Sequence, residues 1–290
     1  MTTNYQKPAI TVITPTLNAA NTIEDNLKSV AIGIDELRKN NEYCEHLIID
    51  GGSTDDTMNI VQLHAKSSSF CCLIKQKGAG AYNAMNEGLT EADGEYSQII
   101  NADDNLINPR QWACMISEIK CIKKAIVISS IIYYHRPGII FDSTWKVNKP
   151  PTRKENWYKK IMAGLHHPHP GFIARTEIYR AVGFDEKYTL SADYKAMHIM
   201  LLNTKIEEIG IYENIFIAMD KNGASSTWQG IKIGMEQIKQ INLELGIKGS
   251  IWQRYAGKAM RRILHNMKRI INSRCGILIR YEINNKYGEL

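Results

Sequence analysis

The sequence has no hydrophobic run long enough to cross a lipid bilayer, and its N-terminus lacks the apolar core of a signal peptide. The longest apolar run, residues 125–134, carries two serines. It is about half as long as the roughly 18 residues that a membrane-spanning helix needs. Residues 1–8 are polar and lead directly into a strand-like run. We therefore expect a protein that stays in the cytoplasm.

Patterns that mark several common protein classes are also missing. The six cysteines form no Cys-x-x-Cys pair and no zinc-like spacing, which favours free thiols. No phosphate loop of the G-x-x-x-x-G-K-[ST] type occurs, and the start of a G-x-G-x-x-G pattern at Gly78-Ala79-Gly80 is broken at Asn83. No nucleic-acid reader motif accompanies the basic residues. These absences weigh against a P-loop enzyme, a Rossmann dehydrogenase and a nucleic-acid-binding protein.

The composition is that of a globular chain with one unusual feature, an uneven charge. The 290 residues are 44% hydrophobic and 23% charged, which suits one large α/β domain or two smaller ones. Residues 230–290 hold twelve Lys and Arg against four Glu, so this segment carries +8 while residues 1–229 carry −2. A basic charge confined to one segment indicates a local partner for that segment.

Strand-like and helix-like segments alternate over the first hundred residues. Apolar, β-branched runs separated by helical patterns occur at residues 9–14, 46–50, 71–75 and 96–100. This alternation predicts a mostly parallel sheet with crossover helices, in which ligands bind beyond the carboxyl ends of the strands.

Three polar groups directly follow the predicted strand ends, namely Pro15-Thr16, Asp50 and the pair Asp103-Asp104. Adjacent carboxylates make each other's ionisation more costly unless a cation or a donor offsets the charge. A hard divalent ion that also carries phosphate oxygens is one such partner. The alternative is an Asp-rich turn that opens a helix near Pro109.

The second half of the chain offers two further candidate sites. His166, His167 and His169 lie close together, but the intervening prolines prevent a helical arrangement and no second ligand pair accompanies them. A zinc site is therefore not expected, whereas one histidine facing a phosphate or a metal, or packed in a loop, fits. Asp193 falls in the first turn of a predicted helix, where it serves either helix-end electrostatics or general base catalysis.

The C-terminal segment has a basic, amphipathic pattern. Residues 228–280 read as helical, with apolar residues at spacings of one, three and four and Lys or Arg between them. This pattern suits an interfacial helix at an anionic membrane, or a helix that packs on the domain and exposes a basic face.

Five segments, taken in order, resemble the family 2 glycosyltransferases of the GT-A fold, the bacterial enzymes that build polysaccharides and O-antigens. Together they fall within residues 9–220 of this chain. They are Ile10-Thr-Val-Ile-Thr-Pro-Thr-Leu-Asn18, Ile48-Ile-Asp-Gly-Gly-Ser-Thr-Asp-Asp-Thr57, Tyr82-Asn-Ala-Met-Asn-Glu-Gly88, Asn101-Ala-Asp-Asp104, and the block from His169 to Asp193 with Gly183-Phe184-Asp185.

The resemblance implies a role for each candidate residue. Pro15, Thr16 and Asn18 would line the nucleotide pocket, and Asp50 would bind the base, a uracil in many relatives. Asp103 and Asp104 are similar to the DXD motif, which holds the ribose and a Mn²⁺ or Mg²⁺ on the diphosphate. His169 stands where relatives often have a histidine and is a third candidate metal ligand. Asp193 looks like the catalytic base. Asn83 replaces an Asp of the family pattern, so the contact to the donor sugar is altered.

The resemblance also implies an architecture and a reaction. We expect a GT-A domain over residues 1–225, with a nucleotide-sugar half (1–108) and an acceptor half (109–225), followed by a basic helical extension over residues 226–290. The expected reaction is metal-dependent, inverting transfer of one hexosyl or N-acetylhexosaminyl group from a nucleotide sugar, often a UDP-sugar. The acceptor would be a glycan or lipid-linked glycan at the inner membrane face. A non-catalytic sugar-nucleotide-binding scaffold of the same fold is the alternative.

Overall fold

The computed structural model describes residues 7–135, 140–147, 154–221 and 227–248. Within these ranges the strands form one nine-stranded sheet in the order β3-β2-β1-β4-β8-β6-β9-β5, with β7 paired to β6. The strands are β1 (Ile10–Thr16), β2 (Cys44–Asp50), β3 (Cys71–Lys75), β4 (Tyr96–Ile99), β5 (Asn105–Leu106), β6 (Ile126–His135), β7 (Ile140–Trp145), β8 (Phe172–Arg175) and β9 (Ile209–Asp220).

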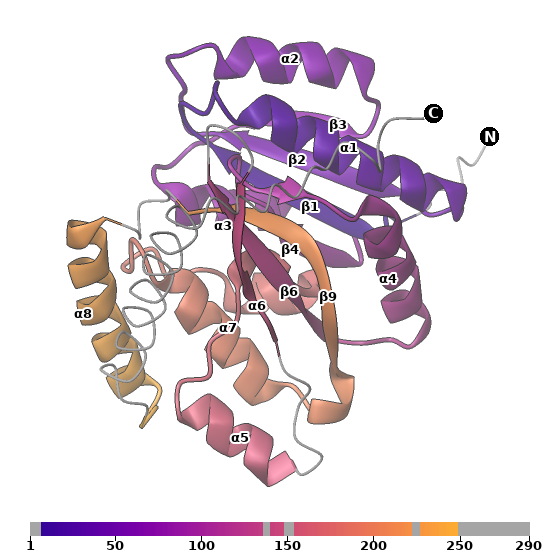
Figure 1. Ribbon diagram of the computed structural model, residues 1–290. Helices are drawn as coiled ribbons and strands as arrows, with labels where there is room; N and C mark the ends of the chain where they lie inside the picture. The colour runs from indigo at the N-terminus through magenta and orange to yellow at the C-terminus, as the bar shows by residue number, and fades with distance from the viewer. Residues whose placement is uncertain (1–6, 136–139, 148–153, 222–226, 249–290) are drawn as a thin grey trace, which may run out of the picture.

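Helices connect these strands and cover both faces of the sheet (Figure 1). Two short 3₁₀ turns, η1 (His169–Gly171) and η2 (Ile206–Glu208), precede β8 and β9. The α-helices are α1 (Ile23–Lys39), α2 (Thr57–Ser67), α3 (Ala81–Glu91), α4 (Pro109–Cys121), α5 (Lys154–Met162), α6 (Thr176–Val182), α7 (Ala192–Asn203) and α8 (Trp228–Glu244).

The N-terminal part of the sheet is parallel, as the alternation of elements predicts. β1 pairs in parallel with β2 and with β4, and β2 pairs in parallel with β3. β8 then runs antiparallel between β4 and β6, and β9 pairs in parallel with β6. All three parallel pairs of the first half therefore direct their carboxyl ends to the same edge of the sheet.

Helices cover both faces of the sheet, and the central strand β1 contributes to a core on each face. On one face Ile10 and Val12 of β1 pack with Val30 of α1 and Trp112 of α4. On the other face Ile13 packs in the cluster that α3 and α7 complete. The change of face from Val12 to Ile13 follows the two-residue period of a strand. In Figure 1, α1 and α2 lie on the upper side of the sheet and α6, α7 and α8 on the lower side.

Helix α8 ends at Glu244, so the helical pattern predicted for residues 228–280 does not form one continuous helix. Gly246 has a φ of 66°, and the Ile247 amide donates to the carbonyl of Asn242 over 2.8 Å. This is the Schellman arrangement, in which a glycine in the left-handed region closes a helix. The basic residues beyond 248 lie outside the described residues, and the helical prediction for them stays a prediction.

Helix α8 packs on the domain. Ile238 and Ile241 are buried in the same core as α3 and α7. Asn242 accepts a hydrogen bond from the Tyr194 hydroxyl over 2.8 Å, and Glu244 receives one from Lys195 over 2.7 Å. The first part of the predicted extension therefore contributes to the core that supports α7.

Residues Ile140–Trp145 form the strand β7, which pairs antiparallel with β6.

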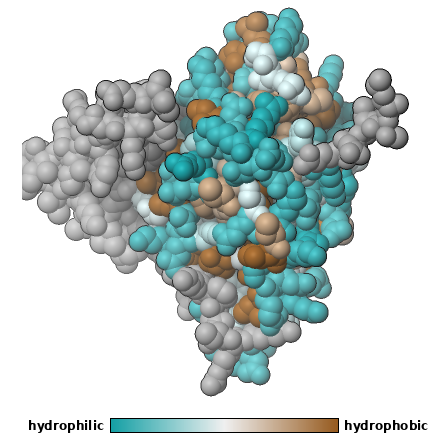
Figure 2. Space-filling view, turned by 90° about the vertical axis from the view of Figure 1, so that its right-hand side faces the viewer, coloured by the Kyte–Doolittle hydropathy of each residue, from teal (hydrophilic) through white to brown (hydrophobic). Residues whose placement is uncertain are grey.

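Figure 2 shows a mainly hydrophilic face on which hydrophobic residues occur in small groups. None of the helices in the described ranges is both long enough and apolar enough to cross a bilayer. The five cysteines in these ranges (Cys44, Cys71, Cys72, Cys114 and Cys121) are free thiols, as predicted.

Candidate functional site

Three strand ends meet at one edge of the sheet, which confirms the convergence expected from the sequence. Thr16 at the end of β1 is in register with Asp50 at the end of β2, and the Gly51 amide donates to the Thr16 carbonyl over 2.9 Å. On the other side of β1, the Ile100 amide donates to the Ile13 carbonyl over 3.0 Å, so Asn101 emerges beside the same edge.

Asp50 is buried and organises the loop that follows β2. Its carboxylate accepts hydrogen bonds from the Gly52 amide over 2.9 Å and from the Ser53 amide over 3.1 Å. The Ser53 hydroxyl donates to it over 2.6 Å. Gly52 has a φ of 91°, a conformation that favours glycine. Asp50 therefore fixes the loop beside the strand ends, and its predicted contact to a nucleotide base remains a prediction.

Asn18 joins the loops that follow β1 and β2. Its side-chain oxygen accepts from the Thr54 amide over 2.8 Å, and its own amide donates to the Ser53 hydroxyl over 2.9 Å. Pro15 is half-buried, and Thr16 is buried with a hydroxyl for which the structure shows no hydrogen-bond partner. A buried hydroxyl without a partner at a strand end is a ready contact for a ligand.

Asp104 points into the protein. Its side chain is 1% exposed, and its oxygens accept from the Asn101 side chain over 3.1 Å and from the Asp220 amide over 3.2 Å. Burial and then the charge of Asp103 raise the pKa of Asp104 well above its usual range. Asn26 of α1 donates to the backbone carbonyl of Asp104 over 2.8 Å. The turn is therefore bound by α1, near the start of the chain, and by the end of β9.

Asp103 is half-buried beside it. Its backbone carbonyl accepts a hydrogen bond from the Tyr134 hydroxyl over 2.5 Å. A cation at this pair would offset the charge that makes ionisation of Asp104 costly. Mg²⁺ and Mn²⁺ at phosphate sites need only one or two protein carboxylates, because phosphate oxygens and water complete the shell. Asp103 is the member of the pair that could hold such an ion, because both oxygens of Asp104 accept hydrogen bonds inside the protein.

His169 lies apart from any cluster of metal ligands. In the described ranges no three His, Cys, Asp or Glu side chains gather as a metal site. His169 is 8% exposed and packs its ring edge-on against Phe184, with 5.5 Å between the ring centres. Burial lowers its pKa, and the charge of Asp193 acts in the opposite direction. The structure thus places His169 near the candidate base.

Asp193 stands in the first turn of α7, as predicted, and receives a hydrogen bond that the sequence did not reveal. The hydroxyl of Tyr82, on α3, donates to Oδ1 of Asp193 over 2.9 Å. The two residues are 111 positions apart in the chain. No local pattern links them, so only the fold brings them together.

Asn83 is held between the two halves of the domain. Its side-chain oxygen accepts from Gln76 over 2.9 Å, and its nitrogen lies 3.2 Å from each carboxylate oxygen of Glu186. Glu87 receives the amides of Lys77 and Gly78. The glycine segment before α3 is therefore fixed at both ends, and Asn83 faces protein groups at the position predicted to touch the donor.

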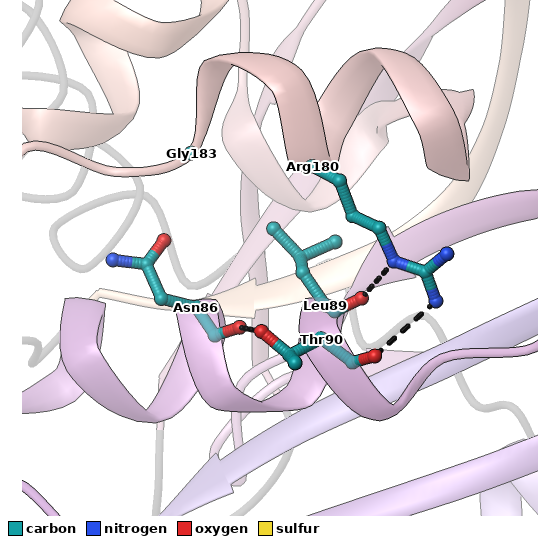
Figure 3. Close-up of a pocket in the computed structure, with 5 residues that line it drawn as sticks. All are labelled: Asn86, Leu89, Thr90, Arg180 and Gly183. Atoms are coloured by element: carbon teal, nitrogen blue, oxygen red, sulfur yellow. Dashed lines mark hydrogen bonds between the residues drawn. The ribbon is translucent and has the colours of Figure 1, made fainter.

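A surface pocket of about 520 Å³ lies between α3 and α6, away from the predicted residues (Figure 3). Arg180 lines it, and its guanidinium donates to the carbonyls of Leu89 over 2.7 Å and Thr90 over 3.3 Å. A third bond reaches the Ala92 carbonyl. Arg180 thus caps the C-terminal end of α3, where the helix dipole favours a cation. Arg180 thereby stabilises the end of the helix that carries Tyr82.

Comparison with known proteins agrees with the fold. The description "Glycosyl transferase family 2" matches residues 11–185 of the chain. The structure of Staphylococcus aureus TarS (residues 1–349) aligns with a TM-score of 0.57 at 19% identity, over 79% of this chain and 65% of that one. The mannosyltransferase PcManGT from Pyrobaculum calidifontis, in complex with GDP-Man and Mn²⁺, aligns with a TM-score of 0.56 at 18% identity, over 81% and 65%.

Curated relatives match over a shorter stretch. "Putative teichuronic acid biosynthesis glycosyltransferase TuaG" of Bacillus subtilis is 35% identical over 103 residues, 35% of this chain and 38% of TuaG. "PGL/p-HBAD biosynthesis glycosyltransferase" of Mycobacterium bovis is 34% identical over 100 residues, 34% and 37% of the two chains. The chain thus spans less than two fifths of each of these relatives.

These observations define the class of protein as an α/β protein of the GT-A fold, with acidic side chains at the carboxyl ends of its parallel strands. The chain belongs to glycosyl transferase family 2.

Proposed function

We propose that the protein transfers a single sugar, with inversion, from a UDP-sugar to a glycan or lipid-linked glycan acceptor of a cell-surface polysaccharide. The observation that carries this proposal is the meeting of Thr16, Asp50 and the Asp103–Asp104 turn at one edge of the sheet. TarS has been crystallised with UDP and with UDP-GlcNAc, which supports a UDP-sugar donor for this fold.

The nucleotide would occupy the loops that follow β1 and β2. Pro15, Thr16 and Asn18 border this position, and Asp50 holds the adjoining loop. Asp103, with Asp104 behind it, would hold a Mn²⁺ or Mg²⁺. When bound, that ion neutralises the charge that develops on the departing diphosphate. The loops orient the nucleotide so that the sugar carbon lies between the leaving group and the acceptor half.

Asp193 would take the proton of the acceptor hydroxyl. The acceptor oxygen then forms a bond to the anomeric carbon while the bond from that carbon to the diphosphate oxygen breaks, and the electron pair leaves with the diphosphate. Attack from the side opposite to the leaving group inverts the configuration. Tyr82 binds Oδ1 of Asp193, and in this proposal Oδ2 is the oxygen that takes the proton.

A panel of donors tests the proposed reaction. We expect UDP release from one or more of UDP-glucose, UDP-galactose and UDP-GlcNAc in the presence of Mn²⁺, and its loss when EDTA is added. GDP-mannose serves as the nucleotide control, and UDP release is measured with a coupled enzyme assay. Tight UDP binding without turnover of any donor would instead support the non-catalytic scaffold.

We further infer that the basic C-terminal segment holds the protein at an anionic membrane surface, where a lipid-linked acceptor would lie. The segment from 249 to 290, outside the described residues, is rich in Lys and Arg. Clusters of basic residues bind anionic lipid headgroups. Deletion of residues 250–290 should release the protein from vesicles of phosphatidylglycerol in a sedimentation assay. Full-length protein and phosphatidylcholine vesicles are the controls, and unchanged binding after deletion would refute this role.

A further inference from the structure

Three side chains of α3 reach across to the segment that carries Asp193. Tyr82 donates to Asp193, and Asn83 contacts Glu186. Asn86 forms a reciprocal pair with the backbone of Phe184, donating to its carbonyl over 2.9 Å and accepting from its amide over 2.8 Å. Helix α3 begins directly after the glycine segment of the nucleotide half. This polar seam therefore ties the donor side of the domain to the candidate base.

Within this seam, Tyr82 is held rigidly. Its ring stacks on Phe184, with 5.6 Å between ring centres and 25° between planes. Phe184 is 4% exposed and is fixed by Asn86. Burial, followed by the charge of Asp193, raises the pKa of the Tyr82 hydroxyl well above its usual range. The hydroxyl therefore keeps its proton near neutral pH and stays a hydrogen-bond donor.

We propose that Tyr82 is the positioning residue of the catalytic base, holding Oδ1 of Asp193 so that Oδ2 takes the proton of the acceptor hydroxyl. This inference rests on the proposed function, in which Asp193 is the base. A carboxylate that can rotate presents either oxygen to the acceptor, and the bond from Tyr82 removes that freedom.

Other titratable groups also experience the charge of Asp193, namely Tyr179 on α6 and His169 in η1. Burial raises the pKa of Tyr179 and lowers that of His169, so burial favours the neutral form of both side chains. On α7 itself, Lys195 is occupied by ion pairs to Asp185 over 2.6 Å and to Glu244 over 2.7 Å.

The variant Tyr82→Phe tests this role, because phenylalanine keeps the stacked ring and removes only the hydroxyl. We expect kcat for UDP release to fall about tenfold and the KM for the donor to stay unchanged. Because a hydrogen bond to a carboxylate favours its charged form, loss of the Tyr82 hydroxyl should move the acidic limb of the pH profile to higher pH. The measurement is UDP release from the best UDP-sugar of the donor panel. It runs from about pH 4.5 to about pH 9, which reaches from near the ordinary pKa of a carboxyl group to beyond neutral pH.

A matched control separates positioning from loss of stability. Tyr194→Phe removes the same kind of hydroxyl from the next residue of α7, where it bonds to Asn242 over 2.8 Å. We expect this control to leave the acidic limb where it is. If both variants move the limb equally, or if Tyr82→Phe moves it not at all, the positioning role is overturned.

Two further measurements keep the inference testable. Site-specific replacement of Tyr82 by 3-fluorotyrosine keeps the shape of the ring and makes the hydroxyl a stronger hydrogen-bond donor. The acidic limb of the pH profile should therefore move to lower pH. Titration of the Asp193 carboxyl carbon by NMR, assigned with Asp193→Asn, should show a lower pKa in the wild type than in Tyr82→Phe. If wild-type protein turned over no donor, the proposed function would fail, while the NMR titration would still show whether Tyr82 controls this carboxyl. Equal Asp193 pKa values in the two proteins would overturn the inference itself.

Discussion

Replacing Asp193 by asparagine should lower the rate of sugar transfer by about 10²–10⁴-fold, the range typical for loss of a general base. Asparagine is close in size to aspartate and can still receive the hydrogen bond from Tyr82, but it cannot take a proton at neutral pH. The proposed function assigns donor binding to the loops that follow β1 and β2 and not to Asp193, so the affinity for UDP in the presence of Mn²⁺ should be unchanged. Transfer is measured by UDP release and UDP binding by calorimetry.

A suitable control for this variant is Asp35→Asn. Asp35 lies exposed on α1, where its carboxylate is 3.7 Å from Arg38. This change removes one carboxylate charge from the surface and should leave both transfer and binding intact. A variant of Asp193 that loses UDP binding and transfer in equal proportion would contradict its role as base. That outcome would assign Asp193 to the support of α7.

The second large effect is expected at the end of β4. Asp103→Asn should lower Mn²⁺-dependent UDP release by about 10²–10³-fold. The change removes the proposed ligand of an ion whose stabilisation of the leaving group's charge is worth several kcal/mol. It should also weaken UDP binding in Mn²⁺ to the level measured in EDTA. The double variant Asp103→Asn and Asp104→Asn should show no metal-stimulated turnover.

The control for the metal site is Asp25→Asn, which changes an exposed residue on α1. Calorimetric titration of UDP with and without Mn²⁺ separates metal binding from nucleotide binding. Full activity of the double variant would contradict the metal-assisted mechanism. Circular dichroism establishes that each variant is folded, which matters most for Asp104 because its side chain is buried.

Much of the donor side could be predicted from the sequence, for a clear physical reason. In parallel α/β sheets every crossover returns the chain to the same edge, so residues that follow the strands are neighbours without any further information. Thr16 and Asp50 therefore meet although 34 positions separate them in the chain. The alternation of short apolar runs with helical patterns was sufficient to place both.

The remaining features depend on tertiary packing that no local pattern records. Asp103 and Asp104 look equivalent in the sequence, yet Asp104 is buried and its oxygens are bound inside the protein. Tyr82 looks like one more residue of a helix that follows a glycine segment. Its bond to Asp193 requires the packing of α3 against α6 and α7. The end of α8 depended on a single glycine, Gly246, within an apolar pattern that continues past it.

The turn that carries Asp103 and Asp104 also has a consequence for biogenesis. Asn26 in the first helix and Asp220 at the end of the last strand both bond to Asp104. β5, which follows this turn, finds its partner in β9. A nascent chain that has not yet reached residue 220 lacks both the amide and the strand that complete this turn. The Asp103–Asp104 turn is therefore completed only after residue 220 has been made, and contacts so distant in sequence form slowly.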